Sequence, residues 1–251
     1  MTKNGFLLKT ITICAIGSTI LFSACKKSFL DNNNNDQQAA GLMAFNLVPE
    51  KTVSVTIGGN VLPGSPLAFN SYSGDYLPVY PGTRTVESFD FATNASLASA
   101  SDSFEVNKYY SVFVIGTTGN YHNILVNDNF DSLSSSSGEA YIRYINAING
   151  SANAAVTISG SSANNSNIAF GSVSDFIAVT PGSTTITVTD GSAVNVNRTI
   201  STEAKKVYTV LLSSGAATSD PAQIKFITNG TLTDDVSGQR VSSSSQGTTI
   251  K

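Results

Sequence analysis

The chain has almost none of the side chains that usually carry covalent or metal chemistry. Among 251 residues there are two cysteines, one histidine and no tryptophan. Cys14 lies in an apolar N-terminal segment that we expect to be removed, which would leave Cys25 alone. A lone cysteine cannot form an intrachain disulfide, and a single histidine cannot complete a zinc site of ordinary composition. We therefore expect no metal and no cofactor.

Charged side chains are also scarce, at 12% of the chain, and the net charge is −3. Loss of Lys3 and Lys9 with the N-terminal segment would leave 12 basic and 17 acidic residues, a net charge of −5. Nucleic-acid binding needs a basic stripe, so nucleic acid is excluded as a partner. Serine, threonine, asparagine and glycine dominate instead, and such a neutral polar surface favours an extracytoplasmic β protein.

The N-terminus has the order of a bacterial lipoprotein signal. Two lysines accompany an apolar run at residues 10–22, which is too short to span a bilayer as a stable helix. The small residues Ser23 and Ala24 then precede Cys25. We expect cleavage before Cys25 and anchoring in the cell envelope through acyl chains on it, with the outer membrane as the expected location and its periplasmic or surface face left open. A non-cleaved anchor, or ordinary cleavage nearby, is the alternative.

The rest of the chain repeats itself. Four short segments recur in the same order, with offsets between 98 and 101 residues. A period near 100 is too long for a solenoid unit and indicates two whole domains. The matched segments are 55–59 with 156–160, 67–71 with 168–172, 79–83 with 179–183, and 108–112 with 206–210.

Each repeat has the pattern of β-strands. Val53, Val55 and Ile57 alternate with polar residues, as do Ile186 and Val188, and this period of two predicts half-buried strands. Turn pairs such as Pro-Gly and Asn-Gly separate about seven such strands in each repeat. The predicted fold class is all-β, with two tandem immunoglobulin-like antiparallel β-sandwich domains after the signal peptide.

Composition sets the predicted boundaries. The asparagine-rich stretch after Cys25 cannot bury apolar area and should be flexible, and the serine-rich stretch between the repeats should link them. The predicted segments are a signal peptide at 1–24, a lipidated flexible tether at 25–40, a first sandwich at 41–130, a linker at 131–138, a second sandwich at 139–237 and a disordered tail at 238–251.

The repeats resemble a known family. The second copy opens with the strand 140–146, continues with a Val-x-Ile strand, then Phe-x-Ser-x-x-x-Phe and Pro-Gly, and ends in Lys-x-Tyr-x-Val. This order resembles the bacterial envelope family of domain of unknown function 4397, over roughly residues 41–129 and 139–233, in a Bacteroidetes-type lipoprotein. In the first copy Met43 stands in place of an arginine. The resemblance implies a fold and a compartment, and no activity.

Catalysis would need residues that the sequence does not supply. The one histidine, His122, is not accompanied by a nucleophile-elbow glycine pattern, and the glutamates show no spacing typical of a glycosidase pair. Residues 127–138 begin like a calcium loop, but Ser132 stands where the loop needs glycine and Gly138 where it needs a bidentate acid. We therefore expect no catalytic residue, no metal site and no enzyme activity.

Two tyrosines are candidates for a ligand-facing surface. Tyr72, Tyr76 and Tyr80 would share one face of an extended stretch. The second repeat keeps an aromatic residue at the middle position, Phe176, which predicts that Tyr76 belongs to the core. Tyr72 and Tyr80 could stack on a sugar ring, and ordinary packing or a rim position is the alternative.

The linker carries a modification signal. Asp131-Ser132-Leu133 resembles the O-glycosylation triplet of Bacteroidetes-type envelopes. Ser132 is therefore a candidate glycan attachment site, and a glycan there would stiffen and protect the linker.

The functional prediction is a non-catalytic, membrane-anchored envelope lipoprotein that presents two β-sandwich domains for binding or adhesion. Its partner, a protein or a glycan of the envelope, is not specified by the sequence. The alternative is a structural spacer without a dedicated ligand, and a hydrolase ranks last because the residues that it needs are missing.

Overall fold

The computed structural model describes residues 39–151, 153–161, 164–191, 194–217, 219–233 and 240–242. The predicted signal peptide, Cys25 and nearly all of the predicted tether lie outside these residues. Within them, no helix is both long enough and apolar enough to cross a membrane.

The first repeat forms two facing sheets, as predicted. The inner sheet has the order β4-β1-β8-β9, and β5 pairs with β1 beside β4. The outer sheet has the order β3-β2-β6-β7. The strands are β1 (Ala40–Asn46), β2 (Val53–Ile57), β3 (Asn60–Val61), β4 (Ser71–Tyr72), β5 (Leu77–Val79), β6 (Gly82–Asp90), β7 (Ser96–Phe104), β8 (Tyr109–Thr117) and β9 (Asn120–Asn127).

The second repeat has the same plan, so the tandem sandwich prediction is confirmed. Its inner sheet has the order β13-β10-β16-β17-β18 and its outer sheet the order β12-β11-β14-β15. The strands are β10 (Ala140–Ala147), β11 (Ala154–Ile158), β12 (Asn164–Ile168), β13 (Ile177–Val179), β14 (Gly182–Asp190), β15 (Val194–Thr202), β16 (Lys206–Ser213), β17 (Gln223–Thr233) and β18 (Arg240–Ser242).

The inner sheets are mixed, whereas the sequence predicted antiparallel pairing throughout. β1 runs parallel to β8, and β10 runs parallel to β16. The reason is topological: the first strand of each repeat is inserted between an antiparallel edge strand and a later strand, β8 or β16, that runs in the same direction as the first strand. All other strand pairs among the described residues are antiparallel.

Each sandwich has its own apolar core, built from the alternating residues that predicted the strands. Val53, Val55 and Val86 are fully buried between the sheets of the first repeat. Ile186 and Val188 take the corresponding role in the second. The polar alternates of the outer sheets face away from these cores, and Thr85 with Ser101 is one cross-strand hydroxyl pair on that outer surface.

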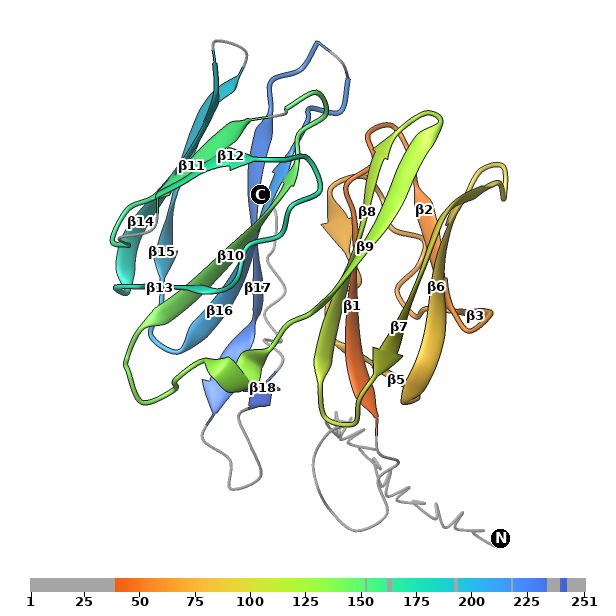
Figure 1. Ribbon diagram of the computed structural model, residues 1–251, viewed down its shortest axis with the longest axis horizontal. Coiled ribbons are helices and arrows are strands. Elements are labelled where there is room, and N and C mark those ends of the chain that lie inside the picture. The colour runs from red at the N-terminus through yellow and green to blue at the C-terminus, as the bar shows by residue number, and fades with distance from the viewer. Residues whose placement is uncertain are drawn as a thin grey trace, which may run out of the picture.

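The two inner sheets pack against each other, which the sequence did not predict. A third apolar cluster joins Phe45 and Phe113 of the first repeat to Ile145, Leu211 and Ile227 of the second. The molecule is therefore a stack of four sheets, with the outer sheets at its two ends (Figure 1). The strands β1 and β10 are consequently buried along their whole length, on both faces, instead of alternating.

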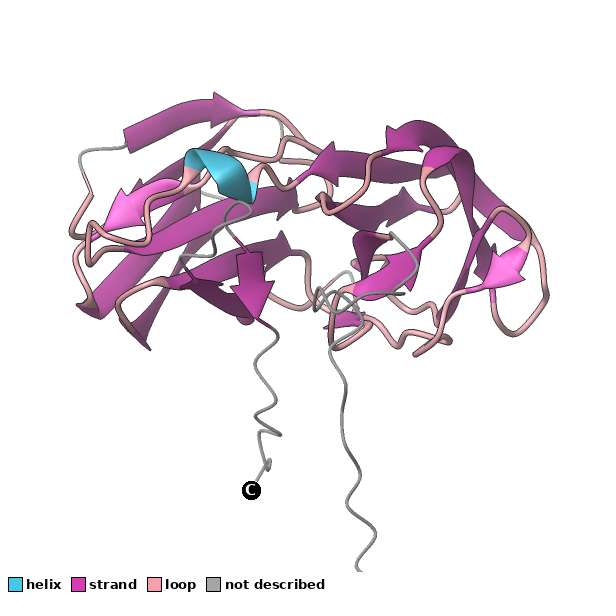
Figure 2. Ribbon diagram, turned by 90° about the horizontal axis from the view of Figure 1, so that it is seen from below, coloured by secondary structure: helices cyan, strands magenta, loops and turns pink. Residues whose placement is uncertain are grey.

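The connections are more ordered than composition suggested. The predicted linker begins in a short 3₁₀ helix at Phe130–Ser132, drawn in Figure 2, and Leu133 is buried in a fourth apolar cluster with Tyr141. At the predicted end of the tether, Ala40 already belongs to β1 and is fully buried. In the predicted disordered tail, Arg240–Ser242 forms β18, which pairs with Thr231–Thr233 at the edge of the inner sheet.

Candidate binding cleft and the interdomain network

A buried ion pair joins the two domains at the centre of their interface. The Arg143 side chain on β10 is 2% exposed and donates to the carboxylate of Asp128, which follows β9 and is fully buried. Arg143 also donates from Nε to Thr209 Oγ1 at 2.9 Å and from Nη2 to Ser111 Oγ at 2.6 Å. The rings of Phe113 and Phe176 flank its guanidinium, with centroids 5.5 and 4.7 Å from Cζ.

Two more residues complete this interdomain network, which comprises Ser111, Asp128, Arg143, Thr209, Tyr76 and Asn229. The Tyr76 hydroxyl donates to Asp128 and accepts from Asn229 Nδ2 at 2.9 Å. Thr209 in turn donates to Asn229 Oδ1 at 2.7 Å. Burial, reinforced by the nearby Asp128 carboxylate, raises the pKa of the Tyr76 hydroxyl well above its ordinary value.

The interdomain network fixes the orientation of the two sandwiches relative to each other. Each of its six side chains has at least one hydrogen-bond partner, and several of the bonds cross from one repeat to the other. Because a buried charge without its partner is costly, few other docking angles can satisfy Arg143 and Asp128 together. The sequence held one signal of this arrangement, a charged residue, Arg143, inside a strand whose other residues except Asn146 are apolar or aromatic, but nothing in the pattern around it predicted a function.

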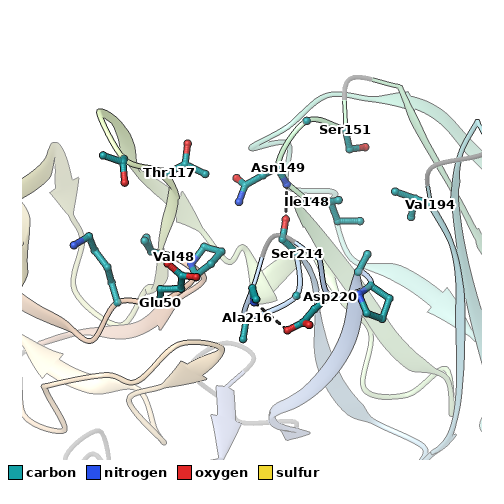
Figure 3. A pocket seen from close by; sticks show the side chains of 18 of the residues that line it. Val48, Glu50, Thr117, Ile148, Asn149, Ser151, Val194, Ser214, Ala216 and Asp220 are labelled. Carbon is teal, nitrogen blue, oxygen red and sulfur yellow. Dashed lines mark hydrogen bonds between the residues drawn. The ribbon is translucent and has the colours of Figure 1, made fainter.

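A cleft opens beside this interface, next to the turns that follow β1 and β10. Its volume is about 530 Å³, and both domains line it. The first domain contributes the β1–β2 turn and the β8–β9 hairpin, and the second contributes the β10–β11 turn, the β14–β15 end and the β16–β17 connection. Figure 3 shows Glu50 and Thr117 on one side of the cleft and Asn149 and Asp220 on the other.

The turns that line the cleft are built in the same way in both repeats. Asn46 donates to Leu67 O at 2.9 Å and accepts from Val48 N at 2.9 Å. Asn146 likewise donates to Ile168 O at 3.0 Å and accepts from the N–H of the residue two positions later, at 3.1 Å. A fully buried asparagine thus holds each turn in place, which makes the cleft a preformed feature.

The connection between β16 and β17 lines the cleft and is longer than its counterpart in the first repeat. Only two residues connect β8 to β9, whereas the β16–β17 connection runs from 214 to 222. Ser214 Oγ accepts from Asn149 N at 2.8 Å, and Asp220 accepts from Ala217 N at 3.0 Å. A Cβ on Gly215 would lie 2.1 Å from Asp220 Cβ, so only glycine permits this close approach. The described residues of this connection therefore fold back on one another and close one side of the cleft.

Carboxylates prevail among the charges of the cleft. Glu50, Asp190 and Asp220 line it, and Lys51 is the one basic residue among the described lining residues. Lys51 is engaged in an ion pair with Asp90, which does not line the cleft. That hydrogen bond raises the pKa of the Lys51 ammonium and lowers the pKa of the Asp90 carboxyl.

The cleft lies at the end of the molecule opposite the entry of the tether. The chain enters the first domain at Ala40, and the cleft-lining turn follows the other end of β1 (Figure 1). At roughly 3.3 Å per residue, the length of β1 separates the two points by about 20 Å.

The structure separates the two tyrosines that the sequence grouped. Tyr72 is half-buried in the apolar cluster between the domains, where its ring stacks on Phe45 with centroids 5.8 Å apart. Tyr80 is 62% exposed in the turn between β5 and β6. They do not form one exposed face, because Tyr72 belongs to the interface. A role for Tyr80 in binding stays a prediction.

The other residues singled out in the sequence do not line the cleft. His122 is exposed on β9, and its Nε2 lies 3.0 Å from Asn120 Oδ1. Ser132 is exposed and donates to Asn129 O at 2.8 Å, so its glycosylation stays a prediction. Cys25 lies outside the described residues. Within the described part of the chain, no group of three or more His, Cys, Asp or Glu residues is placed to hold a metal ion.

Comparisons with known proteins bear on the family. No curated protein matches the chain. A solved structure from Bacteroides ovatus, described as a candidate cell adhesion protein, aligns with 8% identity over 79% of this chain and 100% of its own, at a TM-score of 0.23. A likeness at that level carries no argument about fold or function. The family described as "Domain of unknown function (DUF4397)" matches residues 40–147 and 140–240. The two matches take in most of the chain, which therefore belongs to the DUF4397 family as a tandem pair of its domains.

Proposed function

We propose that the protein is a lipid-anchored cell-envelope protein that binds a ligand in the cleft between its two domains. The anchor would be acyl chains on Cys25 in the outer membrane, with a tether between Cys25 and the start of β1 at Ala40. The two locked sandwiches would then act as one rigid body that holds the cleft away from the lipid. The proposed activity is binding, without catalysis.

One observation carries this proposal: a preformed cleft of about 530 Å³ is built jointly by both repeats, at the end of the molecule away from the tether. Small-ligand sites commonly have volumes of roughly 300–1,000 Å³ and commonly lie at domain interfaces. The folded β16–β17 loop supports the same view, because the first repeat makes the corresponding connection with two residues.

A structural spacer is the second candidate, favoured by the interdomain network. A buried arginine that pairs with a carboxylate of the other domain resists bending between the domains, which is what a spacer requires. A spacer would have no need of the cleft, so a ligand bound there separates the two functions.

The anchor is tested by labelling growing cells with radioactive palmitate. We expect label on the wild-type chain and none on Cys25→Ala, which should be lost from the membrane fraction. Protease treatment of intact cells then assigns the periplasmic or the surface face. An unlabelled wild-type chain released into the medium would contradict the anchor.

The binding function is tested with residues 26–251, which retain every described residue. The chain is applied to a glycan array and used for pull-down from envelope extracts, beside Ala216→Trp, which should obstruct the cleft. We expect a partner that the wild type retains and Ala216→Trp loses, whereas Tyr80→Ala tests the exposed aromatic separately. A partner held equally by the wild type and Ala216→Trp would place binding elsewhere, and the absence of any partner would favour the spacer.

A further inference from the structure

We propose that the ligand of the cleft is a linear oligoamine, a molecule with primary ammonium groups at both ends of a methylene chain. This inference rests on the proposed binding function and names the class of ligand that the lining residues fit.

Charge is the first reason. Glu50 lies on the wall from the first domain and Asp220 on the wall from the second, as Figure 3 shows. Asp190 also lines the cleft from the second domain. Among the described residues, neither Glu50 nor Asp190 has an ion-pair partner, and the lysine of the cleft is already engaged with Asp90. Carboxylates on opposite walls fit a ligand that is positive at both ends.

The apolar residues of the cleft are the second reason. Tyr121 and Ala222 line it as partly exposed side chains. They pack against the cores of the two sandwiches, which fixes their positions. Between carboxylates, such residues match methylene groups better than the hydroxyls of a sugar, which would lose hydrogen bonds against them.

An unsatisfied hydroxyl is the third reason, and it is independent of the acids. Ser151 lines the cleft, is 3% exposed, and its Oγ has no hydrogen-bond partner. Buried polar atoms in folded proteins almost always have a partner, so an orphaned one beside a cleft points to a ligand group. A serine oxygen can accept a hydrogen bond from an ammonium N–H, which agrees with the charge of the walls.

The test uses spermidine as the probe and isothermal titration calorimetry on residues 26–251. Triethylene glycol, a neutral chain of similar length, is the matched control ligand. We expect spermidine to bind with one site per chain, and triethylene glycol to give no heat of binding. Raising the salt concentration should weaken spermidine binding, because partly exposed charge pairs are screened.

Variants then locate the bound probe. Glu50→Gln and Asp190→Asn should each weaken spermidine binding roughly two- to fivefold, and the double variant about tenfold. Glu105→Gln neutralises an exposed acid on the connection between β7 and β8, outside the cleft, and should leave binding unchanged. Ser151→Ala should weaken binding as well, which a purely electrostatic attraction to the surface would not predict.

Two outcomes overturn the inference. Spermidine that fails to bind, or binds Glu50→Gln and Glu105→Gln equally well, excludes an oligoamine site in the cleft. The broader proposal, that the cleft binds a ligand, is tested separately. It stands without the oligoamine if Ala216→Trp abolishes capture of a neutral glycan or protein partner. It is contradicted if no partner depends on the cleft.

Discussion

The two repeats share their strands and turns but differ at the centre of their interface. Where the second repeat carries Arg143, the first carries Met43, and both side chains are buried there. Ser111 and Asp128 form one hydrogen-bonded pair, and Thr209 and Asn229 form its counterpart in the second repeat. The contacts are reciprocal, as in an isologous dimer, but only one of the two equivalent positions bears a charge pair.

The charge that one buried region can hold accounts for the difference between the two halves. Met43 and Arg143 occupy equivalent positions in the two repeats. Because equivalent faces of the repeats pack together, both positions lie in the same buried region of the interface. One arginine with one aspartate is neutral there, whereas two arginines would need two partners in the same space. The second half of the interface instead uses a neutral amide, with Asn229 Nδ2 lying 3.9 Å from Met43 Sδ. Charge asymmetry thus makes a nearly symmetric interface uniquely oriented.

Removing the arginine should have the largest effect. Arg143→Met copies the residue of the first repeat but leaves Asp128 buried without its counter-charge, so we expect a loss of about 3–5 kcal/mol in the free energy of unfolding. Adding Asp128→Asn, which copies the neutral residue of the second repeat, should recover most of the loss. Denaturant unfolding measures both variants. A double variant no more stable than Arg143→Met would show that the charge pair is not what the interface depends on.

Adding a second arginine is the reciprocal experiment. Met43→Arg should cost about 3 kcal/mol, because the new charge is buried beside the neutral Asn229 and its side chain is larger than the one it replaces. Asn229→Asp in the same chain supplies a carboxylate and should restore part of the stability, as measured by denaturant unfolding. Equal stability of Met43→Arg with and without Asn229→Asp would contradict the proposed equivalence of the two halves.

Much of each domain, but little of their contact, could be predicted from the sequence. The alternation around Val53–Ile57 and the recurrence of four segments predicted two sandwiches, because burial on one face has a period of two. The interface could not be derived in this way, since β1 and β10 are buried on both faces and lose that period. The run Leu42–Phe45 is continuously apolar, which is the signal of two-sided burial, yet it does not say what covers the second face.

The cleft could not be predicted from the sequence for a related reason. Its walls come from turns and loops of both repeats, and their meeting depends on the angle at which the domains dock. Tyr72 shows the same limit, because a tyrosine found in only one repeat suggested a ligand-facing surface, whereas it packs against Phe45 between the domains.

A smaller effect is expected at the tyrosine of the interdomain network. Tyr76→Phe copies Phe176 of the second repeat and should cost about 1–2 kcal/mol, because Asp128 and Asn229 each lose one hydrogen bond and keep others. The variant should also change the response to alkali. Burial raises the pKa of Tyr76 in the folded state, while the unfolded chain ionises near its ordinary value of 10.0.

The sign of that response follows from proton binding. Above about pH 10 the folded state retains a proton that the unfolded state releases, so the wild type should lose stability between pH 10 and the raised pKa of Tyr76, and show no such loss below pH 10. Tyr76→Phe should make this decline less steep in unfolding measured at about pH 9, 10 and 11, and the rest of the decline should persist because burial also raises the pKa of Tyr72, Tyr110 and Tyr208. The exposed Tyr80→Phe is the control, and an identical decline in both variants would contradict the assignment to Tyr76.

The smallest effect is expected at the turns beside the cleft, where the repeats differ in one backbone detail. Glu50 has a φ of 60° and Gly150, at the matching turn position, has a φ of 79°. A left-handed backbone is unfavourable for glutamate and unstrained for glycine, so Glu50→Gly should stabilise the fold by about 0.5–1 kcal/mol, and Gly150→Ala should destabilise it by a similar amount. Thermal unfolding of both variants measures this. A Glu50→Gly variant that is more stable but binds spermidine more weakly would show that the Glu50 carboxylate contributes to binding at a cost in backbone strain. Lower stability of Glu50→Gly would mean that Glu50 makes stabilising contacts that outweigh its backbone strain.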